Sequence, residues 1–250
     1  GVEGESAVRI AFCAAYTAVD AAESDPDSAF ALNAEGPENL ARIAAEMNCP
    51  LLHISTDYVF DGTKRHPYQE EDPACPQTVY GKSKTAGEKA IVSVLPHNHL
   101  ILRISWLYGV YGKNFVETMV RIFREKGRAR VIDDQIGAPT YAAVLADNIV
   151  GIINRNIPSR GIFHYADQGE ISWYDFACAV AEEALDHKLI FEKPVITPIP
   201  TREFPSPAPR PASSRFDKSK AQTELGLSIL PWRTNLNHYF QERSTLHETF

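Results

Sequence analysis

No run of apolar residues in this 250-residue chain approaches the ~18 residues that a membrane-spanning helix needs. The first six residues also lack the charged and then apolar layout of a secretory signal. Cysteine is scarce, and no two cysteines form the C-x-x-C pair of a zinc or redox site: Cys13, Cys49, Cys75 and Cys178. We therefore expect a cytoplasmic protein with reduced thiols, no membrane partner and no bound metal.

Positive charge is in the minority, with 25 Lys and Arg against 32 Asp and Glu, which gives a net charge of -7. This balance argues against nucleic acid as a partner, although a local basic pocket can still hold a diphosphate. The shares of hydrophobic and charged residues, 44% and 23%, are ordinary for a globular domain and exclude disorder and fibrous repeats. The expected ligand is a small molecule.

Four short apolar runs have the composition of parallel strands that are buried on both faces: residues 8–15, 50–55, 100–107 and 161–166. Helical patterns lie between or after these runs, at 28–47, at 114–126 and from Ser172 onward. Gly127 is the expected cap of the second helix, and Ser172 with Asp175 forms a capping-box pair for the third. Strands that alternate with helices predict an α/β fold with a doubly wound parallel sheet, which binds ligands at its carboxyl edge.

Seven prolines between residues 194 and 211 break any long helix or inner strand. We interpret this stretch as an irregular lid or loop, followed by a helical tail at 231–243. A proline-rich recognition peptide is the alternative. The aromatic and basic residues that follow, together with the helical tail, favour a folded cap.

Tyr80 and Lys84 are four positions apart, so on a helix both side chains project from one face within a single turn. A free tyrosine titrates near ~10, and a neighbouring lysine cation stabilises the phenolate and lowers the pKa. The pair therefore has the composition of an acid catalyst. Because Y-x-x-x-K also occurs by chance in many helices, this interpretation depends on the surrounding sequence.

Ser55, Thr56 and Asp57 follow directly on a predicted buried strand, which places two hydroxyls and a carboxylate at the carboxyl edge of the sheet. There Thr56 can hydrogen-bond a substrate carbonyl. The alternative is that the hydroxyls only satisfy backbone groups of the turn and that Asp57 caps the next segment.

Taken together, these segments resemble the extended short-chain dehydrogenase/reductases and, within them, the dTDP-4-dehydrorhamnose reductase family. The resemblance covers nearly the whole chain, and STDYVFDGT and DQIGAPT are far more specific than Y-x-x-x-K. The matching segments are AAYTAVDAAE (14–23), LNAEGPENLA (32–41), STDYVFDGT (55–63), VYGKSKTAGEKA (79–90), LRISWLYG (102–109), NFVETM (114–119), DDQIGAPT (133–140) and RPASSRFD (210–217).

The resemblance implies NAD(P)H-dependent reduction of the C4 ketone of a nucleotide-linked deoxysugar, dTDP-4-dehydro-L-rhamnose to dTDP-L-rhamnose, a precursor of cell-surface polysaccharide. Tyr80 would donate the proton to the keto oxygen, Lys84 would tune Tyr80 and hold the nicotinamide ribose, and Thr56 would position the carbonyl. The residues expected to line NADPH or NADH are Ala14, Ala15, Tyr16, Ser55, Tyr80 and Lys84. Those expected to contact the substrate are Thr56, Asp57, Trp106 and Arg210, the last with the turn at 137–140 at the nucleotide or its diphosphate.

One part of the family pattern is missing, because the chain has no G-x-x-G-x-x-G turn to hold the cofactor pyrophosphate. The first predicted strand aligns with the family's fourth, so we expect an incomplete Rossmann-like domain at 1–135 whose first βαβ unit is absent. Residues 136–250 are then mostly a substrate-binding cap, with strand 161–166 and helix 172–185 returning to the Rossmann sheet. On this interpretation the chain is a truncated homologue with weak cofactor binding.

Other functions stay open at this point. The regulatory subunit of methionine adenosyltransferase, the beta type, is not catalytic and is similar from STDYVFDGT to Y-x-x-x-K, but SWLYG, DDQIGAPT and RPASSRFD favour the reductase. A catalytically impaired truncated homologue and a sister reductase or epimerase for another nucleotide sugar are further alternatives. A homodimer is a candidate assembly.

Overall fold

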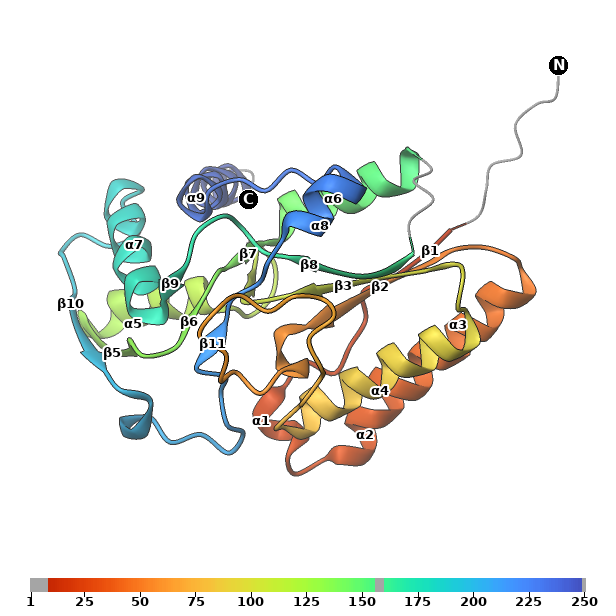
Figure 1. Cartoon of the computed structure of the whole chain (residues 1–250). Helices are drawn as coiled ribbons and strands as arrows, with labels where there is room; N and C mark the ends of the chain where they lie inside the picture. The colour runs from red at the N-terminus through yellow and green to blue at the C-terminus, as the bar shows by residue number, and fades with distance from the viewer. Residues whose placement is uncertain (1–8, 156–159, 249–250) are drawn as a thin grey trace, which may run out of the picture.

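A computed structural model of the chain describes residues 9–155 and 160–248. At its centre is a four-stranded parallel sheet in the order β1–β2–β3–β8 (Figure 1). The strands are β1 (Ile10–Phe12), β2 (Leu51–Thr56), β3 (His99–Ile104) and β8 (Gly161–Tyr165). Helices α3 (Gly36–Glu46) and α4 (Val79–Val94) cover one face, and α6 (Ala142–Asn154) and α8 (Ser219–Leu225) cover the other. The predicted α/β fold with a doubly wound parallel sheet is confirmed.

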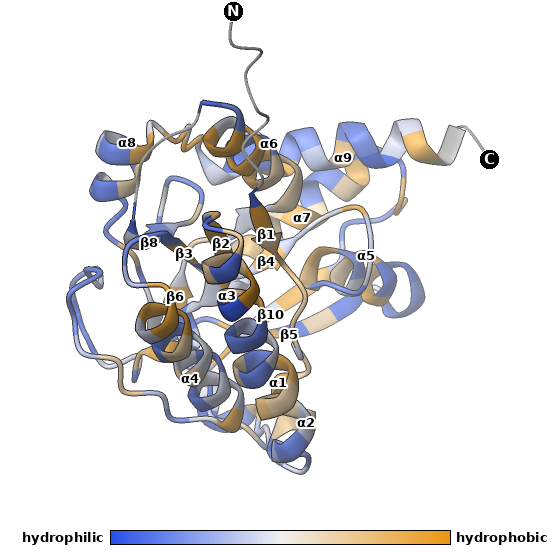
Figure 2. Cartoon of the chain, turned by 90° about the vertical axis from the view of Figure 1, so that its right-hand side faces the viewer, coloured by the Kyte–Doolittle hydropathy of each residue, from blue (hydrophilic) through white to orange (hydrophobic). Residues whose placement is uncertain are grey.

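The core of this sheet is apolar on both faces because successive strand residues point to opposite sides. Leu51 and Ile101 pack with residues of α3 and α4, whereas Leu52 and Leu102 pack with residues of α6 and α8. Figure 2 shows strands β1 to β3 between these helix layers. The layered packing explains why β2 and β3 read as unbroken apolar runs.

Strand β1 differs from its prediction, which was a long strand buried on both faces. It spans three residues, Ala11 is exposed, and Ile10 and Phe12 are only half-buried. Within the described residues β1 pairs with β2 alone and lies at the edge of the sheet. An edge strand shields fewer of its side chains than an inner strand does.

A second layer of structure stands at the carboxyl end of the sheet and is formed by α5 (Phe115–Lys126), β5 (Arg128–Ile132), α7 (Trp173–Asp186), β10 (Val195–Ile199) and α9 (Trp232–Glu248). The expected caps are present: Gly127 ends α5, and Ser172 and Asp175 form a capping box at α7. Asn114, predicted as the first residue of the helix, is its N-cap. The helical tail is also confirmed as α9, which runs beyond the predicted end.

Helix α7 was expected to return to the central sheet, but it packs on α5, β5, β10 and α9. The reason lies in its apolar stripe, because Phe176 stacks on Phe115 of α5 with ring centroids 5.5 Å apart. Strand β8, by contrast, pairs with β3 as predicted.

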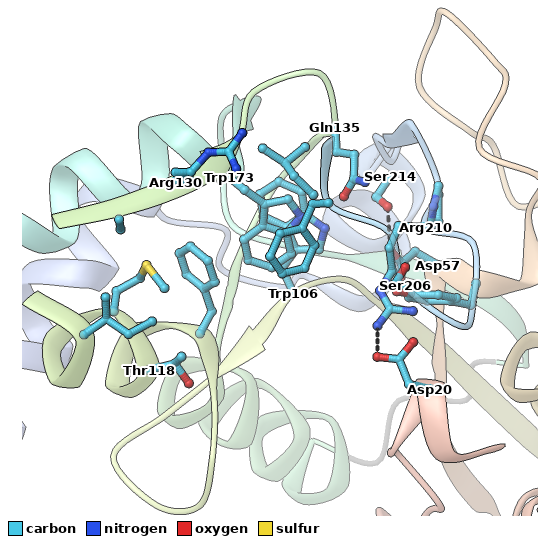
Figure 3. Close-up of a pocket in the computed structure, with 18 of the residues that line it drawn as sticks. Asp20, Asp57, Trp106, Thr118, Arg130, Gln135, Trp173, Ser206, Arg210 and Ser214 are labelled. Atoms are coloured by element: carbon cyan, nitrogen blue, oxygen red, sulfur yellow. Dashed lines mark hydrogen bonds and ion pairs between the residues drawn. The ribbon is translucent and has the colours of Figure 1, made fainter. Parts of the chain in front are cut away.

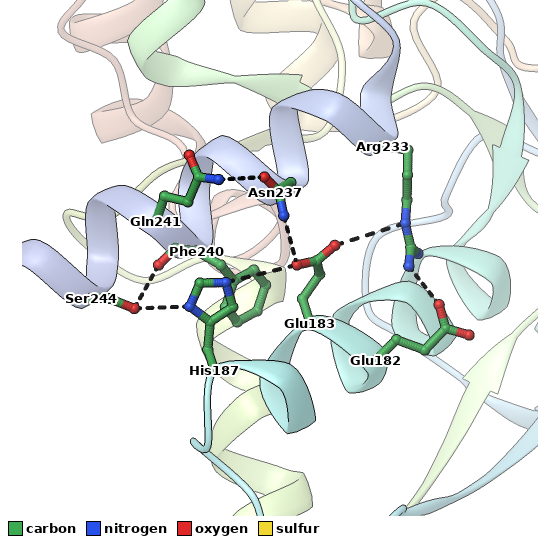
Figure 4. A network of polar contacts seen from close by, with 8 residues as sticks. All are labelled: Glu182, Glu183, His187, Arg233, Asn237, Phe240, Gln241 and Ser244. Carbon is green, nitrogen blue, oxygen red and sulfur yellow. Dashed lines mark hydrogen bonds and ion pairs between the residues drawn. The ribbon is translucent and has the colours of Figure 1, made fainter.

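Polar side chains also hold α7 against α9 (Figure 4). Glu183 accepts a hydrogen bond from Asn237 at 3.3 Å and lies 3.9 Å from the side-chain nitrogens of Arg233 and His187. His187 in turn lies 3.0 Å from the Ser244 hydroxyl. The tail helix is therefore a fixed part of the second layer.

The proline-rich stretch is more regular than predicted, since it contains β10, in which Pro198 is a strand residue. Among the residues that the structure describes, β10 pairs with β5 alone, and an edge position tolerates a residue without an N–H. The remaining short elements are α1 (Val19–Ala22), α2 (Pro26–Phe30), a π-helical turn (Ala31–Glu35), 3-10 turns (Asp57–Val59 and Thr201–Glu203), β4 (Leu107–Tyr108), β6 (Ile136–Gly137), β7 (Thr140–Tyr141), β9 (Ile171–Ser172) and β11 (Ser213–Ser214). Among the described residues, no helix combines the length and the apolar character that crossing a membrane requires.

Asp167, just past β8, is a completely buried carboxyl. Asn235 and the Tyr141 backbone lie close to it, yet neither carboxylate oxygen makes a well-formed hydrogen bond with the described residues. Lys218 donates to the main-chain oxygen of Asp167 at 2.9 Å rather than to its carboxylate. Burial therefore raises the pKa of Asp167 to about 7, although Asn235, Tyr141 and Lys218 lower it in part.

We predict that Asp167→Asn makes the protein more stable at pH 8 than the unmutated chain. An unfolded aspartate titrates near ~4. The folded chain therefore retains a proton that the unfolded chain has lost, and stability falls by up to ~1.4 kcal/mol per pH unit as the pH rises toward 7. Denaturant unfolding at pH 4, 6 and 8 should show this slope in the unmutated chain and a smaller one in the variant. Asp147→Asn, at an exposed position of α6, is the control, and equal slopes in all three proteins would contradict the prediction.

Candidate active site

Helix α4 carries a polar seam along its buried side. Its N-cap is Thr78, whose hydroxyl accepts a hydrogen bond from the Gly81 N–H at 3.0 Å. Tyr80, Lys84 and Glu88 follow at intervals of four residues, so they share one face of the helix, and all three are buried. This face meets the residues that end β2.

Two glycines allow α4 to approach the chain so closely. A Cβ atom at Gly81 would stand 2.2 Å from the carbonyl oxygen of Tyr58, and one at Gly87 would stand 2.1 Å from the carbonyl oxygen of Asn33. No larger side chain fits at either position without a shift of the backbone. The glycine between Tyr80 and Lys84 therefore brings the helix against the turn that follows β2.

A chain of hydrogen bonds runs from the end of β2 to the proline-rich segment. The Thr56 hydroxyl donates to the Asp57 carboxylate at 3.0 Å and accepts from the Tyr58 N–H at 3.2 Å. The other Asp57 oxygen accepts from the Ser214 hydroxyl at 2.5 Å. These bonds fit both interpretations of Thr56 and Asp57. They satisfy polar groups of the turn, and they also hold Thr56 beside Tyr80, where a catalytic role is possible.

Tyr80 is a protonated phenol at neutral pH. Burial raises its pKa to about 12, the charge of Asp57 adds to this effect, and the hydrogen bond with Thr56 lowers it only in part. We expected Lys84 to lower the pKa of Tyr80. That expectation was wrong, because burial is the largest influence on this phenol and it raises the pKa.

Lys84 faces the backbone of β2. Its ammonium group donates to the carbonyl oxygen of Ile54 at 2.7 Å and lies 3.2 Å from Nε2 of His53. Burial lowers the pKa of Lys84 to about 8, although Glu88 raises it in part. Burial and the positive charge of Lys84 also lower the pKa of His53, so this imidazole is neutral and can accept a hydrogen bond from Lys84.

The loop after β1, which holds the predicted cofactor residues Ala14, Ala15 and Tyr16, is fixed by a residue that we did not predict. Asn33, fully buried in the π-helical turn, accepts from the Tyr16 N–H at 2.8 Å and donates to the Tyr16 carbonyl at 3.0 Å. It also donates to the Ser83 hydroxyl of α4 at 3.0 Å. The sequence signal that could have identified Asn33 is a polar asparagine in the middle of an otherwise apolar helical pattern. π-helical turns are frequent at functional sites.

Ser55 lies at the end of β2 with a buried hydroxyl that makes no hydrogen bond within residues 9–155 and 160–248. Phe12, the last residue of β1, is paired with His53, two residues before Ser55. A free hydroxyl and a loop of small residues near Lys84 fit the nicotinamide half of a dinucleotide. The sequence supplies no glycine-rich turn for the pyrophosphate, so the fit covers one half of such a cofactor.

A cavity of about 710 Å³ lies between the carboxyl edge of the sheet and the second layer (Figure 3). Its end near the sheet is polar, with Asp57, Arg210 and Ser214. Its far end has the apolar side chains of Phe115 and Met119, with Thr118 and Arg130 on the same side. The predicted substrate residues Asp57, Trp106 and Arg210 all line this cavity. Gln135, Trp173 and Asp20 also line it and were not predicted, since no local pattern marks them.

Two stacked tryptophans stand between the polar and the apolar end. The rings of Trp106 and Trp173 are 3.7 Å apart between centroids, at an angle of 14°. Trp106 has a left-handed backbone (φ 49°), which is uncommon for a residue with a side chain. Gly137 makes room for it, because a Cβ atom there would stand 2.9 Å from the Trp106 ring.

The predicted catalytic residues stand one layer behind the cavity. Tyr58 lies in its wall, and the Tyr58 ring meets Tyr80 edge-on with centroids 5.4 Å apart. Tyr80, Thr56 and Lys84 are not among the lining residues. The structure therefore brings the predicted residues into two adjoining groups, which are separated by one side chain.

We predict that Gly81→Ala destabilises the fold by about 1–3 kcal/mol, the usual cost of overpacking, because the new methyl group collides with a backbone oxygen. Lys82→Ala, at the exposed next position of the same helix, should change the free energy of unfolding by less than about 0.5 kcal/mol. Denaturant unfolding of both variants measures the difference. An unchanged free energy of unfolding for Gly81→Ala would show that α4 has room to move.

Known proteins resemble the chain over most of its length. The dTDP-4-dehydrorhamnose reductase of Aggregatibacter actinomycetemcomitans is 41% identical over 229 residues, which cover 90% of this chain and 78% of that protein. The enzyme of the same name from Salmonella typhimurium is 41% identical over 235 residues, 93% of this chain and 78% of its own length. A crystal structure of the Bacillus anthracis dTDP-4-dehydrorhamnose reductase in complex with NADP matches with a TM-score of 0.86 and 38% identity, over 93% of this chain and 80% of that one.

A family model, the RmlD substrate binding domain, matches residues 3–245. With a family model over nearly the whole chain and relatives about 40% identical, the chain belongs to the dTDP-4-dehydrorhamnose reductase (RmlD) family.

Proposed function

We propose that the chain reduces the C4 ketone of dTDP-4-dehydro-L-rhamnose to give dTDP-L-rhamnose, with NADPH or NADH as the hydride donor. One observation carries this proposal: a protonated phenol, Tyr80, is linked through Thr56 to Asp57, which lines a cavity that also contains Arg210 and aromatic rings. A proton donor beside such a cavity suits carbonyl reduction on a nucleotide sugar, and the reductases in the family support the substrate.

In the proposed mechanism Tyr80 is the general acid. A pKa of about 12 keeps its proton in place at neutral pH, so Tyr80 can give that proton to a carbonyl oxygen as negative charge develops there. Thr56 lies beside the phenol, and Asp57 fixes the orientation of the Thr56 hydroxyl by accepting its proton in a hydrogen bond. In this arrangement Thr56 does not contact the substrate carbonyl directly. It helps to place Tyr80, which donates the proton to that carbonyl.

The bound nicotinamide cofactor supplies hydride to the carbonyl carbon. Lys84 and Ser55 would hold its ribose and nicotinamide side, and the loop at Ala14, Ala15 and Tyr16 would border it. The NADP complex of the Bacillus anthracis relative supports this class of cofactor.

The cavity suggests how a nucleotide sugar lies. We assign the sugar to the polar end near Asp57 and Trp106, and the diphosphate to Arg210, because a guanidinium group matches phosphate oxygens in geometry and charge. The apolar end at Phe115 and Met119 then accepts the flat base. The cavity volume of about 710 Å³ lies within the usual range for small-molecule sites, so it suits a nucleotide sugar.

The alternative of a methionine adenosyltransferase regulatory subunit is not supported, because several relatives about 40% identical to the chain are named as reductases. The division at residue 135 into a cofactor-binding and a substrate-binding region stays a proposal. The site residues do not divide at this position, because Asp57, Trp106 and Phe115 precede it and line the proposed substrate cavity. A cytoplasmic location and a homodimer stay predictions.

The direct test is an assay of the purified chain with NADPH and dTDP-4-dehydro-L-rhamnose, with the loss of NADPH and the formation of dTDP-L-rhamnose both measured. The cofactor should be present at millimolar concentration. dTDP-glucose, which has no ketone, is the control. A chain that binds both ligands but forms no product would contradict the proposal.

We predict that Tyr80→Phe lowers turnover by about 10²-fold or more, the usual effect of losing a general acid. The free energy of unfolding should change little, because the ring remains in place. Steady-state assays measure turnover, and Tyr111→Phe, at a position that is 78% exposed, is the matched control. Normal turnover of Tyr80→Phe would remove this residue from the mechanism.

We predict that Trp106→Ala weakens binding of the sugar nucleotide at least tenfold and costs less stability than the ~3–5 kcal/mol of a truncated core tryptophan. The reason is that Trp106 is half-buried and lines the cavity. Calorimetric titration and thermal melting separate the two effects. Leu107→Ala, an exposed neighbour outside this cavity, is the control. A large loss of stability with unchanged affinity would make Trp106 a core residue.

A further inference from the structure

The segment from Phe204 to Ser214 forms one wall of the cavity, and it is held in place at two points. At its far end the Ser213 N–H donates to the Gly62 carbonyl at 3.0 Å, and the Ser214 hydroxyl donates to Asp57 at 2.5 Å. Nearer its middle it is held by Asp20 of helix α1. The first anchor belongs to the site already described, whereas Asp20 has no role in it.

The Asp20 carboxylate uses both oxygens on this segment. One oxygen accepts from the Arg210 guanidinium at 2.6 Å (Figure 3). The other accepts from the Ala208 N–H at 3.2 Å. The guanidinium also donates to the Ala208 carbonyl at 3.0 Å. These three bonds fix the orientation of the guanidinium plane, because they hold it against a piece of backbone that the same carboxylate holds.

The geometry leaves Arg210 able to bind a ligand. A guanidinium group has five N–H donors, and the bonds to Asp20 and Ala208 use two of them. Arg210 lines the cavity at the end where Asp57 and Ser214 lie. An arginine that is oriented before the ligand arrives loses less side-chain entropy on binding than a free one does.

Asp20 also lies close in sequence to the loop at Ala14, Ala15 and Tyr16, which borders the proposed cofactor site. Arg210 is 190 positions away along the chain. We propose that Asp20 is a positioning residue, which orients Arg210 toward the diphosphate of the nucleotide sugar and ties the substrate wall to the cofactor loop. This inference rests on the proposed function, since it takes a nucleoside diphosphate group as the ligand of Arg210.

The direction in which a substitution of Asp20 changes the affinity for a diphosphate separates this positioning role from a purely electrostatic effect. Asp20 is a negative charge beside a site for an anion, so its removal alone should strengthen binding of a diphosphate. If Asp20 orients Arg210, its removal weakens that binding instead. We expect Asp20→Asn to weaken binding of thymidine diphosphate about tenfold.

The first experiment is calorimetric titration of the chain with thymidine diphosphate, without cofactor. Asp20→Asn is compared in two backgrounds, the unmutated chain and Arg210→Ala. The tenfold loss should appear in the first and shrink to less than twofold in the second, because Asp20 acts through Arg210. Glu170→Gln is the matched control, since Glu170 pairs with Arg215 of the same region at 3.0 Å and lies outside the cavity. It should leave the affinity unchanged.

The second experiment needs no ligand. Hydrogen exchange of the Ala208 amide should be about tenfold faster in Asp20→Asn, because that amide donates to Asp20. Unchanged exchange, or equal or tighter binding of thymidine diphosphate by Asp20→Asn, would overturn the positioning role and leave the proposed function intact. Failure of the unmutated chain to bind thymidine diphosphate would contradict the proposed function, and the inference with it.

Discussion

The buried ion pair between Arg103 of β3 and Glu88 of α4 determines where this helix lies on the sheet. Two bonds of 2.9 and 2.6 Å join the side chains, which are each 4% exposed, so neither charge has an alternative partner in water. Removal of one partner of such a pair costs ~3–5 kcal/mol, because the other charge is left buried and unpaired. Tyr80 and Lys84 lie two turns and one turn before Glu88 on the same face, so their positions follow from this contact.

The same burial explains the electrostatics of the site. Tyr80 and Lys84 lie against the sheet, away from water that would stabilise their charged forms. Burial therefore moves each toward its neutral form, with a pKa of about 12 for Tyr80 and about 8 for Lys84. A tyrosine that keeps its proton suits the donation of a proton. The aromatic and polar residues of the second layer, by contrast, face a cavity and suit recognition.

The sequence predicted the central sheet well, because the apolar runs of β2, β3 and β8 and the caps at Asn114 and Ser172 are local signals. It did not predict where α7 packs, since the Phe176–Phe115 contact joins segments far apart in the chain. The resemblance to a family indicated Tyr80, Lys84 and Trp106 as candidates. Their burial, and with it the raised pKa of Tyr80, depends on neighbours brought together only by folding.

The π-helical turn at Ala31–Glu35 has a consequence for how the cofactor loop can vary. Asn33 holds the backbone of Tyr16 by both its N–H and its carbonyl, and it is itself bonded to Ser83. The path of the loop is therefore fixed by residues of the π-helical turn and of α4. The side chains of Ala14 and Ala15 are not needed to maintain it. Evolution can exchange these loop side chains to alter what the loop contacts, and the shape of the loop is inherited from residues that never touch the ligand.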